Sequence, residues 1–194
     1  MTLFSTFALA YFFGSIPFGL LLSQAAGLGD IRTIGSGNIG ATNVLRSGRK
    51  GLALLTLLFD AGKGAAAVML AQMLYPSDYA PLAALFAVVG HVFPVWLQFQ
   101  GGKGVATAIG ALIALNWVLG AAVCALWLLA FLFTRTSSLA SLIAIGWSGA
   151  AAYVMDDFLA AILCLCLAAI ITFTHHTNIK RLLAGNEPVF RSVK

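Results

Sequence analysis

The sequence contains few charged residues. They make up 9% of its 194 residues, while hydrophobic residues make up 61%. Acidic side chains are the scarcer kind, with 6 Asp and Glu against 11 Lys and Arg. A soluble domain of this size needs more charge than this to cover its surface. With a mean hydropathy of +0.98, the chain is predicted to be a membrane protein with several spans and no additional soluble domain.

Cysteine is also scarce, since only Cys124, Cys164 and Cys166 are present, all within apolar runs. Two positions two residues apart on a helix point to nearly opposite sides, so Cys164 and Cys166 cannot share a ligand easily. We interpret the three as packing residues. This pattern argues against a disulfide framework or a thiolate metal site.

The apolar segments predict an all-α membrane protein with seven transmembrane helices. Each crossing needs about 20 apolar residues. Residues 104–134 would rise about 46 Å as one helix, too long for a core of about 30 Å, so we divide them by a hairpin turn near Asn116 and Trp117. The predicted spans, within a single polytopic domain covering residues 1–194, are 3–26, 51–75, 80–97, 104–116, 118–134, 138–155 and 158–174.

The charges indicate how these spans face. With seven spans, the basic residues of the loops and termini collect on one side: Arg32, Arg46, Arg49, Lys50, Lys103, Arg135, Lys180, Arg181, Arg191 and Lys194. Asp78, Asp156 and Asp157 occupy the opposite loops. The positive-inside rule then places the N-terminus outside and the C-terminus in the cytoplasm. An undivided fourth segment would instead put Lys103 and Arg135 on opposite sides.

The net charge and the first apolar segment allow two further predictions. The net charge of +5 reports membrane orientation and gives no indication of nucleic-acid binding. No basic residue precedes the first apolar stretch, which favours a retained span over a cleaved signal peptide.

A glycine-rich polar string, GSGNIGATNVLR, occupies residues 35–46. Such a loop exposes backbone N–H groups, and Ser36, Asn38, Thr42 and Asn43 add small polar side chains. Arg46 adds a forked cation, and this combination suits a phosphate oxyanion. The alternative is a flexible interfacial loop whose glycines only make turns.

A second string, Gln100-Gly-Gly-Lys-Gly104, precedes the fourth apolar segment. Its glycines allow a backbone to approach an anion, and Lys103 supplies charge at a helix N-terminus. It is not a nucleotide P-loop, because Leu97 and Gly104 stand where that motif needs Gly and Ser or Thr.

Three ionisable residues lie within the apolar segments. Asp60 and Lys63 are three residues apart, so a helix places them on one face where they can pair or contact a substrate. His91 lies in the third predicted span, about two helical turns from its cytoplasmic end. It can donate to a substrate oxygen or to a neighbouring carbonyl.

The last apolar segment is followed by His-His-Thr-Asn-Ile-Lys-Arg-Leu-Leu-Ala-Gly-Asn-Glu at residues 175–187. His176, Asn178 and Lys180 return to the basic face and can complete a polar basin there. The alternative is a basic tail that binds anionic lipid headgroups, which we prefer for Arg181, Arg191 and Lys194.

Taken together, these strings resemble the bacterial acyl-phosphate:glycerol-3-phosphate acyltransferase family of the PlsY type. The likeness covers nearly the whole chain and rests on four ordered motifs: GSGNIGATNVLR at 35–46, DAGKG at 60–64, GHVFPVWLQFQGGKGVAT at 90–107 and HHTNIKRLLAGNE at 175–187. A different glycerolipid acyltransferase family carries His-x-x-x-x-Asp, which is missing here, since Trp96, Lys180 and Arg181 follow the histidines at that distance.

The resemblance implies a monomeric seven-span enzyme of the bacterial inner membrane, with its active site facing the cytoplasm. Its partners would be sn-glycerol 3-phosphate, acyl phosphate and membrane lipid, with no cofactor and no metal, and its products lysophosphatidic acid and phosphate. We expect His91, Ser36 and Asn178 to act at the reacting groups. We expect substrate binding by Asn38, Thr42, Asn43, Arg46, Lys63, Gly101, Gly102, Lys103, Gly104 and His176.

Acyl phosphate already has a good leaving group, so no Ser or Cys nucleophile is required. Arg46 and Lys103 would offset the repulsion between the two anionic substrates. The proton of the attacking hydroxyl would pass to a substrate phosphate, or alternatively to His91. The leading non-enzyme alternative is a small transporter or channel for phosphate or an organophosphate, although the outer loops offer few polar residues for access from both faces.

Overall fold

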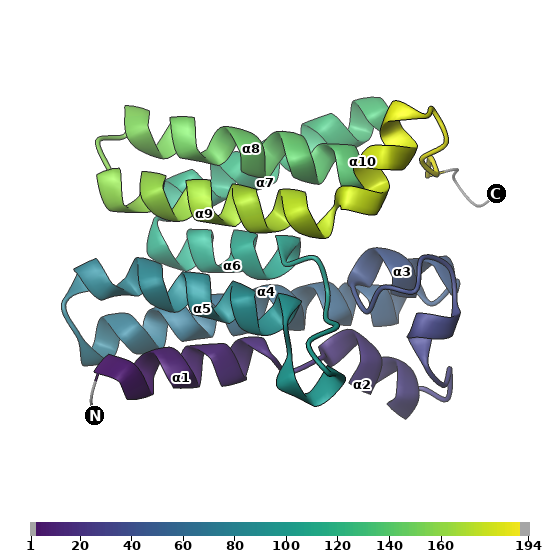
Figure 1. Ribbon diagram of the computed structural model, residues 1–194, viewed down its shortest axis with the longest axis horizontal. Helices are drawn as coiled ribbons and strands as arrows, with labels where there is room; N and C mark the ends of the chain where they lie inside the picture. The colour runs from purple at the N-terminus through teal and green to yellow at the C-terminus, as the bar shows by residue number, and fades with distance from the viewer. Residues whose placement is uncertain (1–2, 191–194) are drawn as a thin grey trace. The chain divides into compact units, whose positions relative to one another are not determined.

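The computed structural model describes residues 3–190, and within that range every regular element is helical (Figure 1). Arg191 and Lys194, expected to bind lipid headgroups, lie outside the described residues. The chain forms two compact units, the first ending at Leu115 and the second beginning at Asn116. Each unit is therefore described by itself.

The first unit is built around one long helix, α4 (Lys50–Leu74). The helices α1 (Leu3–Gly14), α2 (Phe18–Ala25), α3 (Ala41–Arg46), α5 (Ala80–Val92) and α6 (Val105–Leu115) all pack against it. Short 3₁₀ turns lie in the connections: η1 (Ile31–Thr33), η2 (Ser77–Tyr79) and η3 (Val95–Leu97). Helices α1 and α5 also pack against each other (Figure 1).

Small residues bring these helices close together. A Cβ atom at Gly64 of α4 would overlap the main chain of Thr107, and one at Gly110 of α6 would overlap the main chain of Ala61. In lipid, close contact between small residues is a main source of helix association, because apolar side chains gain little by leaving the tails. Gly64 therefore serves tight packing of α4 against α6.

The first predicted span, residues 3–26, corresponds to the apolar segment Phe4–Ala25, but the helix within it is interrupted. Helix α1 ends at Gly14 and α2 begins at Phe18. Pro17 has no N–H to donate and disfavours the helical conformation at Ile16, so the chain breaks there. The Ile16 carbonyl consequently accepts a bond from the N–H of Phe18 and remains accessible to a further donor.

The third predicted span, residues 80–97, matches the apolar segment Ala80–Leu97, and its helix is also interrupted. Helix α5 stops at Val92, because Pro94 disfavours a helical Phe93, which has φ −123° and ψ 60°. His91 therefore lies in the last turn of α5. Beyond η3 the chain reverses through positive φ angles at Gln98 and Phe99 and returns alongside the end of α5.

The second unit contains α7 (Trp117–Thr134), α8 (Ser137–Val154), α9 (Phe158–Thr174) and the short α10 (His176–Leu183). Helix α8 packs against both α7 and α9, and α10 is bent by 68° from α9. The side chain of Asn116 caps α7 by accepting the N–H groups of Val118 and Leu119. The helix is therefore interrupted at Asn116, where the sequence predicts a turn, and the hairpin of two spans stays a prediction.

Five segments of the described residues are long and apolar enough to cross a membrane: Phe4–Ala25, Lys50–Leu74, Ala80–Leu97, Trp117–Thr134 and Ser137–Val154. A sixth arises if the bent pair of α9 and α10 is one span. Helix α6, with 11 residues, rises only about 16 Å at about 1.5 Å per residue. An all-helical chain with several apolar helices is confirmed, and a seventh crossing stays a prediction.

Candidate active site

Three ionisable side chains meet inside the first unit. The Lys63 Nζ lies 2.9 Å from Asp60 Oδ1, and His91 Nδ1 lies 3.6 Å from the same oxygen. Their side chains are 2%, 3% and 5% exposed. Taking charges out of water is costly even when they are paired, so an ionisable group inside a span points to function.

The pairing of Asp60 with Lys63 confirms the expectation from their spacing of three residues on α4. The Lys63 ammonium also donates to the Ile16 carbonyl at 2.7 Å and lies 5.7 Å from the centre of the Phe18 ring. These contacts join α4 to the break between α1 and α2. The direct substrate contact expected for Lys63 stays a prediction.

His91 packs against the glycine-lysine loop, residues 100–104. The N–H of Gly102 donates to the His91 carbonyl at 3.0 Å, and the N–H of Gly101 donates to the Val92 carbonyl at 3.0 Å. A Cβ atom at Gly102 would overlap the Nε2 of the His91 ring. Gly102 is therefore needed here because its main chain lies directly on the imidazole.

These bonds limit what the loop can offer to a substrate. The N–H groups of Gly101 and Gly102 already bond to α5 carbonyls, so their predicted substrate contacts would need other atoms or a rearranged loop. Gly104 has a φ of +87°, and its carbonyl accepts the N–H of Ala108 at the start of α6. Lys103 is half-buried beside this helix N-terminus, where a cation and exposed N–H groups can bind an anion together.

The side chain of Asn43 organises the loop at residues 35–46. Its Oδ1 accepts the N–H and the hydroxyl of Ser36, at 2.8 and 3.1 Å. Its Nδ2 donates to the carbonyls of Ile31 and Ile34, each at 3.0 Å. Asn43 is 2% exposed and holds the loop through these bonds, and the substrate contact expected for it stays a prediction.

The other predicted ligands of this loop are more accessible. Asn38 accepts the N–H of Gly40 at 2.9 Å and is half-buried, as is Thr42. Ser36 is exposed, and so is Arg46, the last residue of α3, whose Cδ lies near Gly35. The loop thus presents a hydroxyl and a guanidinium at the surface of the first unit, both suited to phosphate oxygens.

An apolar cluster supports both loops. It contains Leu20, Ile31, Ile39, Val44 and Ala53, and Leu97 of η3 packs against it together with Ile34, Leu45 and Leu52. Ile31, Ile39 and Val44 belong to the segment that carries Ser36 and Arg46, while Leu97 precedes the glycine-lysine loop. The two predicted anion-binding loops therefore share one hydrophobic support in the first unit.

The remaining predicted site residues, His176 and Asn178, belong to α10 in the second unit. Asn178 is 5% exposed and donates to Glu187 Oε1, which also accepts the Ser138 hydroxyl at 2.7 Å. Arg181 Nε donates to Glu187 Oε2 at 2.6 Å. His176 is exposed, and its Nδ1 lies 3.0 Å from the Phe173 carbonyl.

Two acidic residues outside the spans have altered pKa values. Hydrogen bonds from the side chain and N–H of Arg32 lower the pKa of Asp30 to about 2, and the side-chain hydrogen bond that Arg32 donates to Asp30 raises the pKa of Arg32. Burial by itself would raise the pKa of Glu187. Hydrogen bonds from Ser138, Arg181 and Asn178 outweigh it, so the pKa of Glu187 is lowered. Both carboxylates are held in their charged form at neutral pH.

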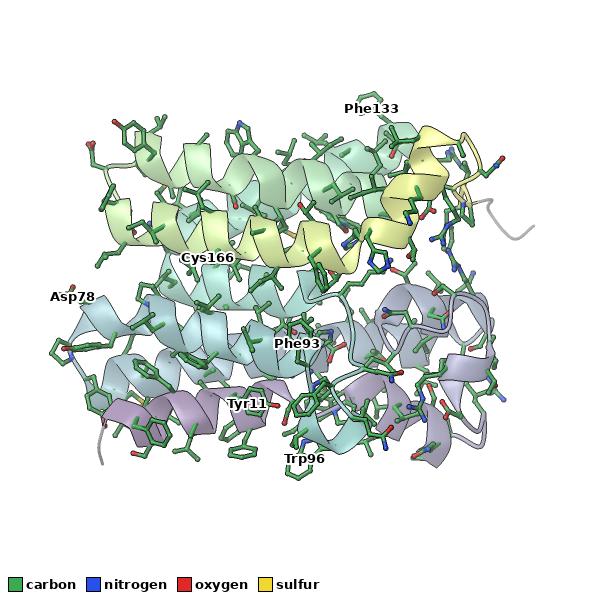
Figure 2. All side chains as sticks on the ribbon, viewed as in Figure 1. Tyr11, Asp78, Phe93, Trp96, Phe133 and Cys166 are labelled. Carbon is green, nitrogen blue, oxygen red and sulfur yellow. The ribbon has the colours of Figure 1, made fainter. Side chains whose placement is uncertain are left out.

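Sequence reasoning gave no role to several residues that fix these positions. Glu187 ends the motif at residues 175–187, but its bonds to Ser138 and Asn178 form only when the chain folds. Near the end of α1, the Tyr11 hydroxyl donates to the Phe93 carbonyl at 2.7 Å, and Trp96 Nε1 donates to Ser15 Oγ at 2.8 Å. Figure 2 shows Tyr11, Phe93 and Trp96 around this region. Pro17 and Pro94 were the available signals, because each marks a helix end.

The described residues include no group of three or more His, Cys, Asp or Glu side chains placed to hold a metal ion. The side chains available to a ligand in the candidate site are instead cations, hydroxyls and amides. Such donors bind oxyanions, phosphate above all.

Comparison with known proteins identifies relatives along almost the whole chain. The model of the glycerol-3-phosphate acyltransferase family matches residues 4–185. A glycerol-3-phosphate acyltransferase of Jannaschia sp. is 51% identical over 183 residues, covering 94% of this chain and 90% of the relative. One of Mesorhizobium japonicum is 55% identical over 178 residues, covering 91% and 90%.

Two solved structures share the fold. Both are crystal structures of PlsY (YgiH), an integral membrane glycerol 3-phosphate acyltransferase. The glycerol 3-phosphate form has a TM-score of 0.93 and 34% identity, covering 98% of this chain and 96% of that one. The form with lysophosphatidic acid has a TM-score of 0.91 and 33% identity, with the same coverage.

Proposed function

The chain belongs to the glycerol-3-phosphate acyltransferase family, and we propose that it transfers a fatty acyl group from acyl phosphate to the 1-hydroxyl of sn-glycerol 3-phosphate. The products are lysophosphatidic acid and inorganic phosphate. The related structures were solved in forms with glycerol 3-phosphate and lysophosphatidic acid, which supports this acceptor and this product. An acyltransferase of this kind supplies phospholipid synthesis.

The observation that carries this proposal is the pair of cationic loops on one apolar support. Arg46 ends one loop and Lys103 lies in the other, while Leu97 and Val44 pack in the same cluster. Two anions brought together repel each other, and fixed cations offset that repulsion without reorganising during the reaction. Because an acyl phosphate donor already has a good leaving group, the reaction needs no activated Ser or Cys nucleophile.

We assign phosphate contacts to Ser36, Arg46 and Lys103, whose side chains are exposed or half-buried. Asn38 and Thr42 lie in the same loop and are half-buried, so they line the approach to it. Asn43 holds Ser36 in place through its own amide. Asn178 is held by Glu187, and we expect substrate contacts for His176 and Asn178 as well.

The proton of the attacking hydroxyl passes to a phosphate oxygen of the substrate. His91 is a poorer base in this geometry, because its Nδ1 side faces Asp60 and its Nε2 faces Gly102. With 5% exposure the ring offers little surface to a substrate. A His91→Gln protein that keeps the parental kcat, even with a raised KM, would support this route, and loss of kcat with unchanged substrate binding would favour His91 as base.

We expect seven spans in the bacterial inner membrane, with the N-terminus outside and the active site facing the cytoplasm. The basic loop residues Arg46, Lys103 and Arg135 support this orientation, and so does the break at Asn116. The enzyme acts as a monomer in lipid, since one chain carries every motif of the site. Labelling of single introduced cysteines by a membrane-impermeant reagent tests the orientation.

The decisive experiment measures lysophosphatidic acid and phosphate released by the purified protein from acyl phosphate and glycerol 3-phosphate. Acyl coenzyme A serves as a parallel donor. We expect product from acyl phosphate alone and a loss of about 10²-fold or more in Lys103→Ala, as for removal of a transition-state donor. Lys50→Ala, which removes an exposed lysine at the start of α4, is the matched control. Product from acyl coenzyme A alone would overturn the proposed donor.

A further inference from the structure

We propose that Asp60 is a positioning residue for the acyltransferase reaction, acting through His91 to fix the glycine-lysine loop. The contacts run from Asp60 to His91, from the His91 ring to Gly102, and from Gly102 along the chain to Lys103. This inference rests on the proposed function in one respect, namely that Lys103 binds substrate phosphate.

Asp60 lies among three separate parts of the first unit. Its carboxylate pairs with Lys63 on α4, and Lys63 in turn holds the Ile16 carbonyl at the break after α1. The same carboxylate oxygen lies 3.6 Å from Nδ1 of His91, at the end of α5. Asp60 therefore connects a helix break, a helix interior and a helix end.

This arrangement leaves a buried ring nitrogen of His91 without a hydrogen-bond partner within residues 3–190. Asp60 Oδ1 and His91 Nδ1 are both buried. Oδ1 is paired with Lys63 Nζ at 2.9 Å, whereas Nδ1 has no hydrogen-bond partner among the described residues. They face each other at a distance longer than a hydrogen bond, and the carboxylate charge favours the imidazole tautomer with its proton on Nδ1. The ring orientation is thus set by Asp60, with Nε2 directed at Gly102.

The position of the glycine-lysine loop depends on the His91 ring. The loop bonds to α5 through the N–H groups of Gly101 and Gly102, and Gly102 also lies directly against the imidazole. A rotated His91 ring would displace Gly102, and Lys103 is the next residue. Since a misplacement of about 1 Å can cost about 10²-fold in rate, a residue that acts only through the ring can control activity.

A buried ion pair adds little net stability to a fold. Apolar residues of similar volume often hold a fold equally well, whereas removing one partner leaves an uncompensated charge. A purely structural pair could therefore be replaced on both sides without functional loss. A positioning pair could not be, and this difference separates the two roles.

The test is the double variant Asp60→Leu/Lys63→Met, compared with the parent for thermal unfolding in detergent and for kcat and KM. We expect unfolding close to the parental temperature, with kcat/KM for glycerol 3-phosphate reduced by about 10- to 100-fold, chiefly through KM. The control is Thr56→Val, one turn away on α4, where a buried hydroxyl bonds only to the Leu52 carbonyl of its own helix. A folded double variant with kcat/KM within about twofold of the parent would show that the pair is structural only.

A second measurement applies if the double variant does not fold. Asp60→Asn, His91→Gln and the two combined form a double-mutant cycle. If Asp60 acts through His91, the combined variant is no worse than His91→Gln alone. Effects on kcat/KM that simply multiply would overturn the inference.

Failure of the proposed function is distinguishable from failure of this inference. If the parent uses acyl coenzyme A instead of acyl phosphate, the proposed donor is wrong, and the Asp60 variants are tested with that donor. If Lys103→Ala retains the parental KM and kcat, the substrate role of the loop is wrong. The positioning role itself is contradicted if Lys103→Ala impairs the enzyme while the double variant keeps its kcat/KM, or while the effects of Asp60→Asn and His91→Gln simply multiply.

Discussion

The first unit contains two acid–base pairs in opposite surroundings. Asp60 and Lys63 are 3% and 2% exposed and join α4 to the break after α1. Asp30 and Arg32 approach to 2.6 Å in the connection that leads to the glycine-rich loop, with 33% and 41% of their side chains exposed. The exposed pair has the shorter contact, yet the buried pair has the greater influence on the fold.

The environment of an ion pair, more than its distance, decides how much the pair contributes to stability. Water screens an exposed pair, and holding two side chains together costs entropy, so its contribution is about 0–1 kcal/mol. A buried pair also contributes little relative to apolar residues, but losing one partner costs about 3–5 kcal/mol. Each prediction below tests this contrast, in order of expected effect.

The largest effect is expected from Lys63→Met. It leaves the Asp60 carboxylate without its counter-ion and the Ile16 carbonyl without its lysine donor. We expect the free energy of unfolding to fall by about 3–5 kcal/mol, measured by thermal unfolding in detergent. Arg32→Met in the exposed pair is the matched control, with a change of about 1 kcal/mol or less. Equal losses in the two variants would remove the contrast.

Gly102→Ala should disturb the buried network without touching a charge. Its Cβ would overlap Nε2 of His91, so ring and loop must separate. Overpacking of this kind costs about 1–3 kcal/mol, and we expect a raised KM for glycerol 3-phosphate.

Gly62→Ala is the control for this glycine, since nothing lies within 4 Å of its Cβ position. It lies on the exposed side of α4, and alanine there should stabilise the helix by about 0.5–1 kcal/mol. A Gly102→Ala protein with parental KM and stability would show that the loop does not depend on contact with His91.

Glu187 is an intermediate case, with 6% exposure beside an Arg181 that is 40% exposed. Glu187→Gln weakens bonds to Ser138, Arg181 and Asn178, for an expected loss of about 1–3 kcal/mol. Because the folded pKa of Glu187 is lowered, its stabilisation is present above the unfolded pKa and disappears as pH falls through the folded pKa. Unfolding temperatures of parent and variant should therefore converge in acid.

The smallest effect is expected from Asp30→Asn. The folded pKa of Asp30 is about 2, against an ordinary value of 3.8, so any stabilisation is present above pH 3.8 and lost as pH falls towards 2. Solvent screening keeps it small. Thermal unfolding at neutral pH and near pH 2 measures the difference, and a large loss at neutral pH would contradict the ranking.

Much of the site was predictable because its signals are local. The spacing of Asp60 and Lys63 fixes a shared helix face, and the pair is present. The division at Asn116 followed from the length of the apolar segment, and Asn116 caps α7. The predicted spans 3–26 and 80–97 are matched by apolar segments, but the helix ends before Pro17 and Pro94 were not predicted, because an apolar run can continue beyond the helix within it.

The roles of individual polar residues were less predictable. Asn43 and Ser36 both looked like phosphate ligands, since a small polar side chain in a glycine-rich loop has the same appearance whether it binds a ligand or the loop. The fold separates them, because Asn43 is buried and bonds to Ile31, Ile34 and Ser36. Burial depends on residues far along the chain, which no local pattern contains.

The membrane class, the helical segments and the family motifs follow from the amino-acid sequence, since apolar length, spacing and glycine content act over a few residues. Tertiary structure alone decided that Asp60 faces His91 and that Gly102 lies on the imidazole. It also decided that Leu97 shares an apolar cluster with Val44. These contacts join residues from different helices and loops, and only close packing of small residues between α4, α5 and α6 brings them within reach.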